Sequence, residues 1–278
     1  MIPTPLITTS WDDGHPLDLR VAEMLHRSNL QGTFYVPRTP PSELTADAET
    51  MSPGQIRELS ASFELGAHTL HHIDLTCVEE HRARHEIVAS KSWLEDCTGH
   101  PCVMFCPPKG KYARRHLHMI REAGFRGMRT VELVSLDYPR PKAGLLLMPT
   151  TLQAHPHGRL CFAKNFARRV AFRNLWLYLL HGRSNNWQDL AQSLLRTALR
   201  HGGVFHLWGH SWEIQETGQW KRLEELFQFL GQFTDQAPAL TNAQVCRAAK
   251  PRVAERSASG DALAAQDGFP FFPSGTSA

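Results

Sequence analysis

The sequence predicts an α/β protein built on a mostly parallel sheet, either open or closed into a barrel. The main observation is a strand-then-helix unit that repeats along the first half of the chain, since such alternation is typical of parallel sheets. The length of 278 residues fits one α/β barrel of roughly 250 residues as well as two domains. The composition, 42% hydrophobic and 21% charged, is ordinary for a globular protein and excludes a fibrous or largely disordered chain.

The first units are indicated by periodicity and by helix-start signals. Residues 5–11 are apolar and β-branched and predict a strand, and apolar side chains at 17, 21, 24 and 25 recur at helical spacing. Residues 32–36 predict the second strand. Ser52 followed by Pro53 indicates the start of the next helix, because proline is favoured in the first turn. The alternation then continues, with strands at 63–65, 103–105, 125–129 and 203–208 and helices at 78–96, 113–123, 187–200 and 219–233.

The rest of the chain is less regular. Between about 131 and 186 prolines interrupt the pattern, and only the apolar stretch 175–180 predicts a helix. Residues 247–278 are rich in Ala, Ser, Gly and Pro and show no periodicity, which predicts a disordered tail. We therefore expect one domain over residues 1–246.

Charge, targeting signals and cysteines exclude several classes of protein. A net charge of +3 is far from the basic balance of a dedicated nucleic-acid binder, so no nucleic-acid partner is expected. The N-terminus does not resemble a secretion signal, and no stretch approaches about 18 apolar residues. We therefore expect no membrane partner and a cytoplasmic location. The six cysteines form no C-x-x-C pair, which argues against a disulfide framework or zinc knuckle.

Three polar clusters follow predicted strands, at the sheet edge where ligands collect in parallel α/β proteins. Residues 10–15 (SWDDGH) hold two adjacent carboxylates, although an Asx turn explains them equally well. Residues 66–74 hold His68 and His72, whose spacing of four lets both rings reach one metal ion. Residues 206–213 end a late strand.

Ordinary explanations compete with these readings. Sixteen histidines give roughly one pair at this spacing by chance, so the spacing alone is a weak motif. His81 and His85 are better explained as a solvated helix face. His206 is better explained as a core histidine, whereas His210 follows the predicted strand end and is better placed to meet a substrate.

Together the clusters suggest a carboxylate and two histidines that hold a metal ion, with a separate acid. Three protein ligands and an open position are the arrangement of catalytic zinc sites. A metal ion lowers the pKa of its water to about 7 and polarises a carbonyl oxygen. The chemistry that the residues indicate is therefore hydrolysis.

The same residues resemble signatures of the polysaccharide deacetylase family, the NodB-homology group of carbohydrate esterases. Residues 10–14 (SWDDG) are similar to its T-F-D-D-G, and residues 68–72 (HTLHH) match its H-[S/T]-x-x-H, followed by 74–76 (DLT) as is usual. Residues 32–36 (GTFYV) resemble its A-T-F-F-V strand. The resemblance extends over most of residues 5–130.

The resemblance implies a fold, a set of roles and a substrate. The fold is a distorted (β/α)7 barrel with a groove at the carboxyl ends of the strands. The implied roles are a general base (Asp12), a general acid (His210, with His206 also fitting the pattern) and metal ligands (Asp13, His68 and His72). The cofactor is expected to be a divalent metal ion, zinc, with cobalt or nickel as alternatives. The expected substrate is a small-molecule or oligosaccharide N-acetyl sugar.

The sequence departs from the family pattern in the segment 105–112 (FCPPKGKY). Cys106 stands where the family has the arginine that orients the catalytic aspartate, while Pro108 and Gly110 keep the shape of the loop. Arg129, at the end of the next strand, is our candidate for the missing guanidinium. A nucleophilic Cys106 is the weaker alternative, because no histidine is adjacent to it in the sequence.

Other residues are expected to bind the substrate or tune the acid. The candidates for binding or orienting the substrate are Trp11, Pro108, Tyr112, Arg129 and Trp208. Trp212 also flanks the site, and core packing explains at least half of these aromatic residues. Residues 145–160, with His155 and His157, lie where the family keeps groove-shaping loops. The family's Asp and Trp motif that tunes the acid has no clear counterpart, with Asp137 and Glu213 as the candidate substitutes.

The predicted function is that of a metal-dependent hydrolase that removes an N-acetyl group from a sugar or sugar-containing small molecule. One alternative is a different amide or cyclic ureide hydrolase on the same fold. Another is a non-catalytic carbohydrate-binding protein that has lost its arginine and kept its groove. The retained carboxylates and histidines speak against the second, because a binding module needs neither a base nor three metal ligands.

Overall fold

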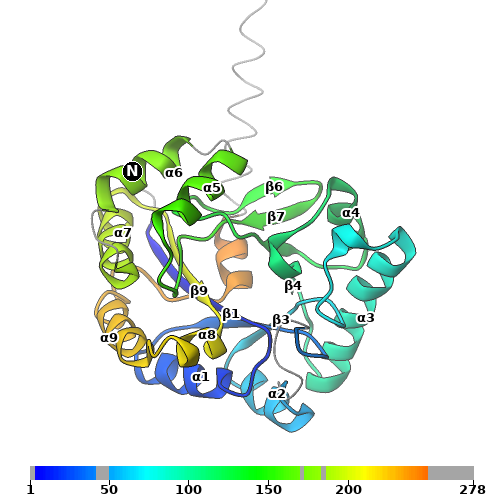
Figure 1. Ribbon diagram of the computed structural model, residues 1–278. Coiled ribbons are helices and arrows are strands. Elements are labelled where there is room, and N and C mark those ends of the chain that lie inside the picture. Colours follow the sequence, from blue (N-terminus) through cyan, green and yellow to red (C-terminus); the bar gives the residue numbers. More distant parts are fainter. Residues whose placement is uncertain (1–3, 42–49, 170–171, 183–185, 250–278) are drawn as a thin grey trace, which may run out of the picture.

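The computed structural model describes residues 4–41, 50–169, 172–182 and 186–249. Strands and helices alternate through its first half: β1 (Leu6–Asp12), α1 (Asp18–Arg27), β2 (Gly32–Val36), α2 (Pro53–Ser60), β3 (Glu64–Ala67), α3 (Glu80–Thr98), β4 (Met104–Phe105), α4 (Arg114–Glu122) and β5 (Gly127–Arg129). The second half contains β6 (Arg140–Lys142), β7 (Leu145–Met148), β8 (Leu152–Gln153), α5 (Arg159–Arg169), α6 (Phe172–His181), α7 (Trp187–His201), β9 (Val204–Gly209), α8 (Ser211–Glu216) and α9 (Trp220–Gly231). Figure 1 shows the helices arranged around a curled sheet.

The predicted fold class is confirmed. The described strands form one sheet in the order β6-β7-β5-β4-β3-β2-β1-β9-β8, and its pairs are parallel except for the antiparallel pair β6 and β7. The nine strands exceed the seven of the expected barrel because β6 and β8 are short additions at the two edges.

The chain itself forces the sheet to curl into a barrel. β7 and β8 lie near opposite ends of the strand order, yet only residues 149–151 separate them in the sequence. Because a chain advances by at most roughly 3.5 Å per residue, the two sides of the sheet must come close together. The carboxyl ends of the parallel strands therefore surround one opening.

Most predicted elements occur within a few residues of their expected bounds. The capping signal at Ser52 is real: its hydroxyl accepts from the Gln55 amide, and the Gln55 side chain accepts from the Ser52 amide. The predicted helix at 175–180 lies within α6. The strands between 140 and 153 were missed because they have two to four residues, too few to show an alternating pattern.

The predicted domain boundary at 246 falls inside a helix. Residues 242–249 are helical, and Val245, Cys246 and Ala249 are buried. The rest of the predicted tail, residues 250–278, lies outside the described residues.

The alternation of side chains along β1 decides which residues reach the barrel interior. Ser10 and Asp12 point inward, where Ser10 contacts His206 at 2.9 Å and Asp12 contacts Arg129. Trp11 points the other way and packs edge-on against Phe227 of α9, with ring centroids 6.0 Å apart. Successive residues of a strand face opposite sides of a sheet, so the expectation that Trp11 binds substrate is wrong.

His206 lies deep in the barrel interior, on β9. Its Nδ1 donates to the carbonyl oxygen of Pro149 at 3.1 Å, so its Nε2 accepts from the Ser10 hydroxyl at 2.9 Å. His210 lies four residues further on, roughly 13 Å along an extended chain. The interpretation of His206 as a core histidine is therefore confirmed.

We expect His206 to make the protein less stable in acid. Burial and the nearby Arg129 lower the pKa of His206 to about 3, whereas an unfolded histidine titrates near about 6.5. Between these values the unfolded chain binds a proton that the folded protein does not. The free energy of unfolding should therefore fall as the pH drops below about 6.5, by up to about 1.4 kcal/mol per pH unit from this residue.

Urea unfolding at near-neutral and mildly acidic pH measures this effect. His206→Gln keeps polar atoms at this position and should lose less stability than the wild type over that pH interval. Equal losses in the two proteins would contradict the assignment.

Candidate active site

Asp12 is held by a buried ion pair at the end of β1. Nη2 of Arg129 donates to both carboxylate oxygens of Asp12, and the two side chains are 0% and 4% exposed. The guanidinium of Arg129 also lies over the ring of Trp208, 4.7 Å from its centroid. Burial opposes the charge on Arg129, but the attraction of Asp12 outweighs it and raises the pKa of Arg129.

The sheet register explains how Arg129 reaches this position. β4 pairs with β5 so that Phe105 lies beside Met128. Cys106 and Arg129 are the next residues of the two chains, so continuing this register would place them side by side. Cys106 is fully buried and small, so the space that a long side chain at 106 would fill is open to Arg129. This is the contact that the missing-arginine hypothesis requires.

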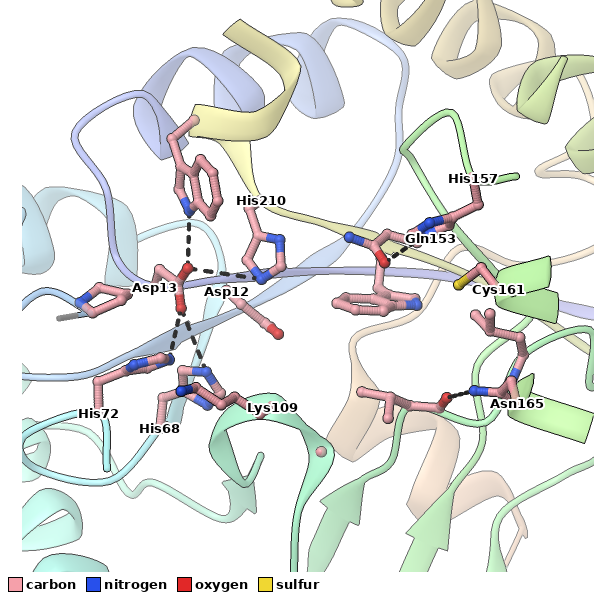
Figure 2. Close-up of a pocket in the computed structure, with 16 residues that line it drawn as sticks. Asp12, Asp13, His68, His72, Lys109, Gln153, His157, Cys161, Asn165 and His210 are labelled. Atoms are coloured by element: carbon pink, nitrogen blue, oxygen red, sulfur yellow. Dashed lines mark hydrogen bonds and ion pairs between the residues drawn. The ribbon is translucent and has the colours of Figure 1, made fainter. Parts of the chain in front are cut away.

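The predicted metal ligands converge on one carboxylate oxygen. Oδ1 of Asp13 lies 3.2 Å from Nε2 of His72 and 3.6 Å from Nε2 of His68, as Figure 2 shows. The three ligand atoms lie within 4.8 Å of one another. Oδ1 of Asp13 is buried and accepts no hydrogen bond. A buried carboxylate oxygen without a donor, facing two imidazole nitrogens, fits a metal ion.

Neighbouring groups orient these ligands. Nδ1 of His68 donates to the carbonyl oxygen of Cys106 at 2.7 Å, which leaves Nε2 to face Asp13. Nε1 of Trp212 donates to Oδ2 of Asp13 at 2.9 Å. Burial opposes the charge of Asp13, but His210, His68 and His72 outweigh it and hold the pKa of Asp13 well below its ordinary value. Such outer contacts fix the tautomer and direction of metal ligands.

The backbone at the site adopts conformations that ordinary residues avoid. Asp13, Thr69, His72 and Lys109 all have positive φ angles, of 82°, 60°, 48° and 58°. Non-glycine residues in this region carry a conformational cost and concentrate at functional sites. The strain at Asp13 and His72 accompanies the turn that brings their side chains together.

Glu86 holds the histidine-containing loop in place, and sequence reasoning missed it. Its carboxylate accepts from the amides of Leu70 and His71 at 3.0 and 2.9 Å and contacts Nδ1 of His71 at 2.7 Å. The segment around it was interpreted as a solvated helix face, which is true of His81 and His85, both exposed. Glu86 shares the buried face of α3 with the apolar positions 83 and 87, a spacing that could have revealed it.

His210 lies at the site and is linked to Glu213. Nδ1 of His210 donates to Oε2 of Glu213 at 2.6 Å, and Nε2 lies 3.7 Å from Oδ2 of Asp13. Burial lowers the pKa of His210, but Asp13 and Glu213 outweigh it and raise that pKa to about 9. Asp137, the other candidate substitute, pairs instead with Arg173 at 2.7 Å. Glu213 is therefore the acidic residue that contacts His210.

A chain of hydrogen bonds extends from His210 across the pocket. Nε2 of Gln153 donates to Oε2 of Glu213 at 2.8 Å, and Nε2 of His157 donates to Oε1 of Gln153 at 2.7 Å. Burial and the neighbouring His155 lower the pKa of His157 to about 4. Sequence reasoning noted His157 only as part of a loop and missed Gln153, which β8 brings beside Trp208 of β9.

Glu213→Gln should lower the hydrolysis rate by about tenfold. The amide can still contact His210, but it removes the negative charge that holds the imidazole in its protonated state and fixed direction. Steady-state rates of wild type and variant measure the change. Glu216→Gln, at the other end of α8, is a matched control. Equal rates for the two variants would show that Glu213 does not support His210.

The site opens into a pocket of about 370 Å³, a size typical of small-molecule sites. Its walls combine the catalytic candidates with apolar and amide side chains. They are Asp12, Asp13, Pro41, His68, His72, Lys109, Gly110, Val131, Leu133, Gln153, His157, Cys161, Asn165, Trp208, His210 and Trp212. Figure 2 shows the metal-ligand candidates at one side of the pocket and His157, Cys161 and Asn165 at the other.

Besides Trp11, three predicted substrate residues lie outside this wall: Arg129, which pairs with Asp12, and Pro108 and Tyr112. Pro108 is buried, and the next residues, Lys109 and Gly110, line the pocket instead. Tyr112 lines a neighbouring groove of about 670 Å³. Pro108 lies in a short turn and Tyr112 follows it. The hydrophobic pattern of the sequence does not predict the path of this turn. Of the aromatic candidates, Trp208 and Trp212 line the pocket.

Comparison with known proteins relates part of the chain to a known family. Residues 3–128 match the family model described as polysaccharide deacetylase. The first part of the chain is thus similar to the polysaccharide deacetylase family. The family consists of hydrolytic deacetylases, which confirms the predicted enzyme class and the predicted removal of acetyl groups from sugars. Its members use a divalent metal ion, and the Asp13, His68 and His72 cluster is a candidate site for one in this chain.

Solved structures show the same fold. A protein from Mycobacterium smegmatis assigned as a polysaccharide deacetylase is 16% identical, with 91% of this chain and 92% of that chain covered and a TM-score of 0.65. Peptidoglycan deacetylase PdaC from Bacillus subtilis is 14% identical, with coverage of 91% and 95% and a TM-score of 0.53. A CE4 family pseudoenzyme from Bacillus anthracis is 12% identical, with coverage of 88% and 66% and a TM-score of 0.53. No match was found among curated protein sequences.

Proposed function

We propose that this protein hydrolyses the N-acetyl group of a sugar, with Asp12 as general base and His210 as general acid. The observation that carries the proposal is the convergence of Asp13, His68 and His72 on one point beside Asp12 and His210, all lining one pocket. In hydrolysis the oxygen of water bonds to the acetyl carbon, and the bond from that carbon to the sugar nitrogen breaks. The products are acetate and an amino sugar.

The residues divide the proton transfers between them. Asp12, fixed by Arg129, is placed to take a proton from the attacking water. His210, fixed by Glu213, has its Nε2 directed at the site and can give a proton to the departing nitrogen. When bound, a divalent ion lowers the pKa of water and polarises the acetyl carbonyl. A base and an acid on separate strands allow both transfers in one site.

We propose zinc as the ion, with cobalt and nickel as alternatives. Two imidazole nitrogens and one carboxylate oxygen are a common ligand set of catalytic zinc sites, which keep one position open. Imidazole ligands also suit other first-row divalent ions, so this ligand set does not by itself select zinc over cobalt or nickel. A cytoplasmic location stays a prediction of the sequence.

The pocket supports a substrate with one or two sugar rings at the reacting end. Trp208 and Trp212 give flat apolar surfaces on which a sugar ring can stack. Gln153 and Asn165 add amide groups to the wall. This mixture of apolar faces and a few polar groups is typical of small-molecule sites.

The fold alone does not decide between catalysis and binding, since a CE4 pseudoenzyme has it too. The residues favour catalysis here: a base, an acid and three candidate metal ligands lie together. A carbohydrate-binding protein has no use for this set.

Acetate release from N-acetyl sugars and their oligosaccharides, with zinc, cobalt or nickel supplied, tests the proposal. We expect release that the Asp12→Asn variant loses. Ammonia release from small amides or cyclic ureides without acetate release would favour the alternative hydrolase. Sugar binding without any hydrolysis would favour the binding protein.

A further inference from the structure

An apolar stripe faces outward on α6, beside the active-site pocket. Phe172, Trp176 and Leu179 are 75%, 63% and 61% exposed, and Leu175 and Leu180 are 37% and 50% exposed. Their spacing follows one face of a helix. We call these five residues the α6 stripe. A contiguous exposed patch of large apolar side chains is unusual on a soluble protein and indicates an interaction surface.

The opposite face of α6 already holds the helix on the protein. Nδ2 of Asn174 donates to the carbonyl oxygen of Leu133 at 2.8 Å. Tyr178 stacks on Phe162 of α5, with ring centroids 4.6 Å apart. His181 contacts the hydroxyl of Ser193 on α7 at 2.7 Å. Folding of α6 therefore does not require the stripe, whose side chains need another explanation.

The stripe lies in a strongly basic part of the chain. Between Asp137 and Asp189 there is no acidic residue and there are eight Lys and Arg. Two of the eight, Arg140 and Arg173, pair with acids that precede the segment. The whole chain has 30 Lys and Arg against 27 Asp and Glu, so the remainder is net negative. The stripe thus belongs to the basic part of the sequence.

This combination identifies the partner by its chemistry. A second copy of the chain would bring two basic segments together at the stripe, which their repulsion opposes. An anionic lipid bilayer offers both an apolar interior for Phe, Trp and Leu and negative headgroups for Lys and Arg. We propose that the α6 stripe docks this protein on the surface of an anionic membrane.

Docking of this kind differs from spanning. Among the described residues no helix combines the length and apolar character that crossing a bilayer requires. The expectation of no membrane partner considered spanning stretches and not an exposed helix face. α5 connects the two sites: it packs on α6 and contributes Cys161 and Asn165 to the pocket wall. Figure 1 shows α5 and α6 together at one side of the ring of helices.

Sedimentation of the full chain with lipid vesicles tests the proposal independently of any enzyme activity. We expect binding to vesicles that contain phosphatidylglycerol and little binding to phosphatidylcholine alone. The double variant Trp176→Glu, Leu179→Glu should bind the anionic vesicles at least about tenfold more weakly. Val88→Glu on α3, where the valine is 44% exposed, makes a similar change elsewhere and should bind like the wild type.

Three results would overturn the proposal. The first is a wild-type protein that does not bind anionic vesicles. The second is a double variant that binds as tightly as the wild type. The third is a wild-type dimer in sedimentation velocity that the double variant dissociates, which would assign the stripe to a second copy. Circular dichroism shows whether the double variant is folded, as its exposed positions lead us to expect.

Discussion

Asp12→Asn is expected to lower the rate of acetate release by about a thousandfold. Asparagine keeps the shape of the side chain but cannot take a proton from water, and a positioned base contributes roughly 10² to 10⁴ in rate. Because Asp13, His68 and His72 are unchanged, metal binding should persist. Acetate release and metal content, measured on the same preparation, separate loss of the base from loss of the ion.

The variant also removes the partner of the buried Arg129. An unpaired buried charge costs about 3 to 5 kcal/mol, so the variant should unfold at lower temperature and must be assayed well below that point. Asp235→Asn on the surface is a control for the substitution itself. A folded, metal-loaded Asp12→Asn protein with the wild-type rate would exclude Asp12 as the base.

Exchanging the residues at 106 and 129 is expected to show that Asp12 needs a guanidinium group beside it, and that the arginine can come from either position. Arg129→Cys should lose about a hundredfold in rate and about 3 to 5 kcal/mol of stability, because Asp12 is left buried without its counter-charge. The ligand atoms of Cys106 and Asp12 lie within 4.8 Å of each other, so an arginine at 106 could approach the same carboxylate.

The double variant Cys106→Arg, Arg129→Cys should therefore recover much of both losses. Kinetics and thermal unfolding of the two single variants and the double variant form the test. Cys106→Arg alone places two guanidinium groups together in the interior and should be the least stable. An Arg129→Cys protein with full activity would show that Arg129 does not support Asp12 in catalysis.

The parts of the site that sequence predicted are those carried by short local patterns. Asp12 ends a strand and Asp13 follows it, and His68 and His72 share one loop, so neighbouring residues reveal them. Arg129 was inferred from a gap at Cys106 and from its place at the next strand end. The prediction that Trp11 binds substrate was wrong, because the strand alternation that points Asp12 inward points the neighbouring Trp11 outward.

The rest depends on contacts between distant segments. The hydrogen bonds from His210 through Glu213 and Gln153 to His157 require β8 to pair with β9. β8 lies in a region where the hydrophobic periodicity of the sequence predicts no strand. The α6 stripe was hidden for another reason. Residues 175–180 are apolar on both faces, so the pattern predicts a helix but cannot say which face is exposed.

Metal content by elemental analysis is the most direct test of the central claim, that Asp13, His68 and His72 hold a catalytic ion. The wild type, His68→Ala and His72→Ala are purified alike after zinc, cobalt and nickel have been supplied in turn. We predict about one divalent ion per chain in the wild type and almost none in either variant. A wild-type protein without bound ion, or variants that keep it, would contradict the claim.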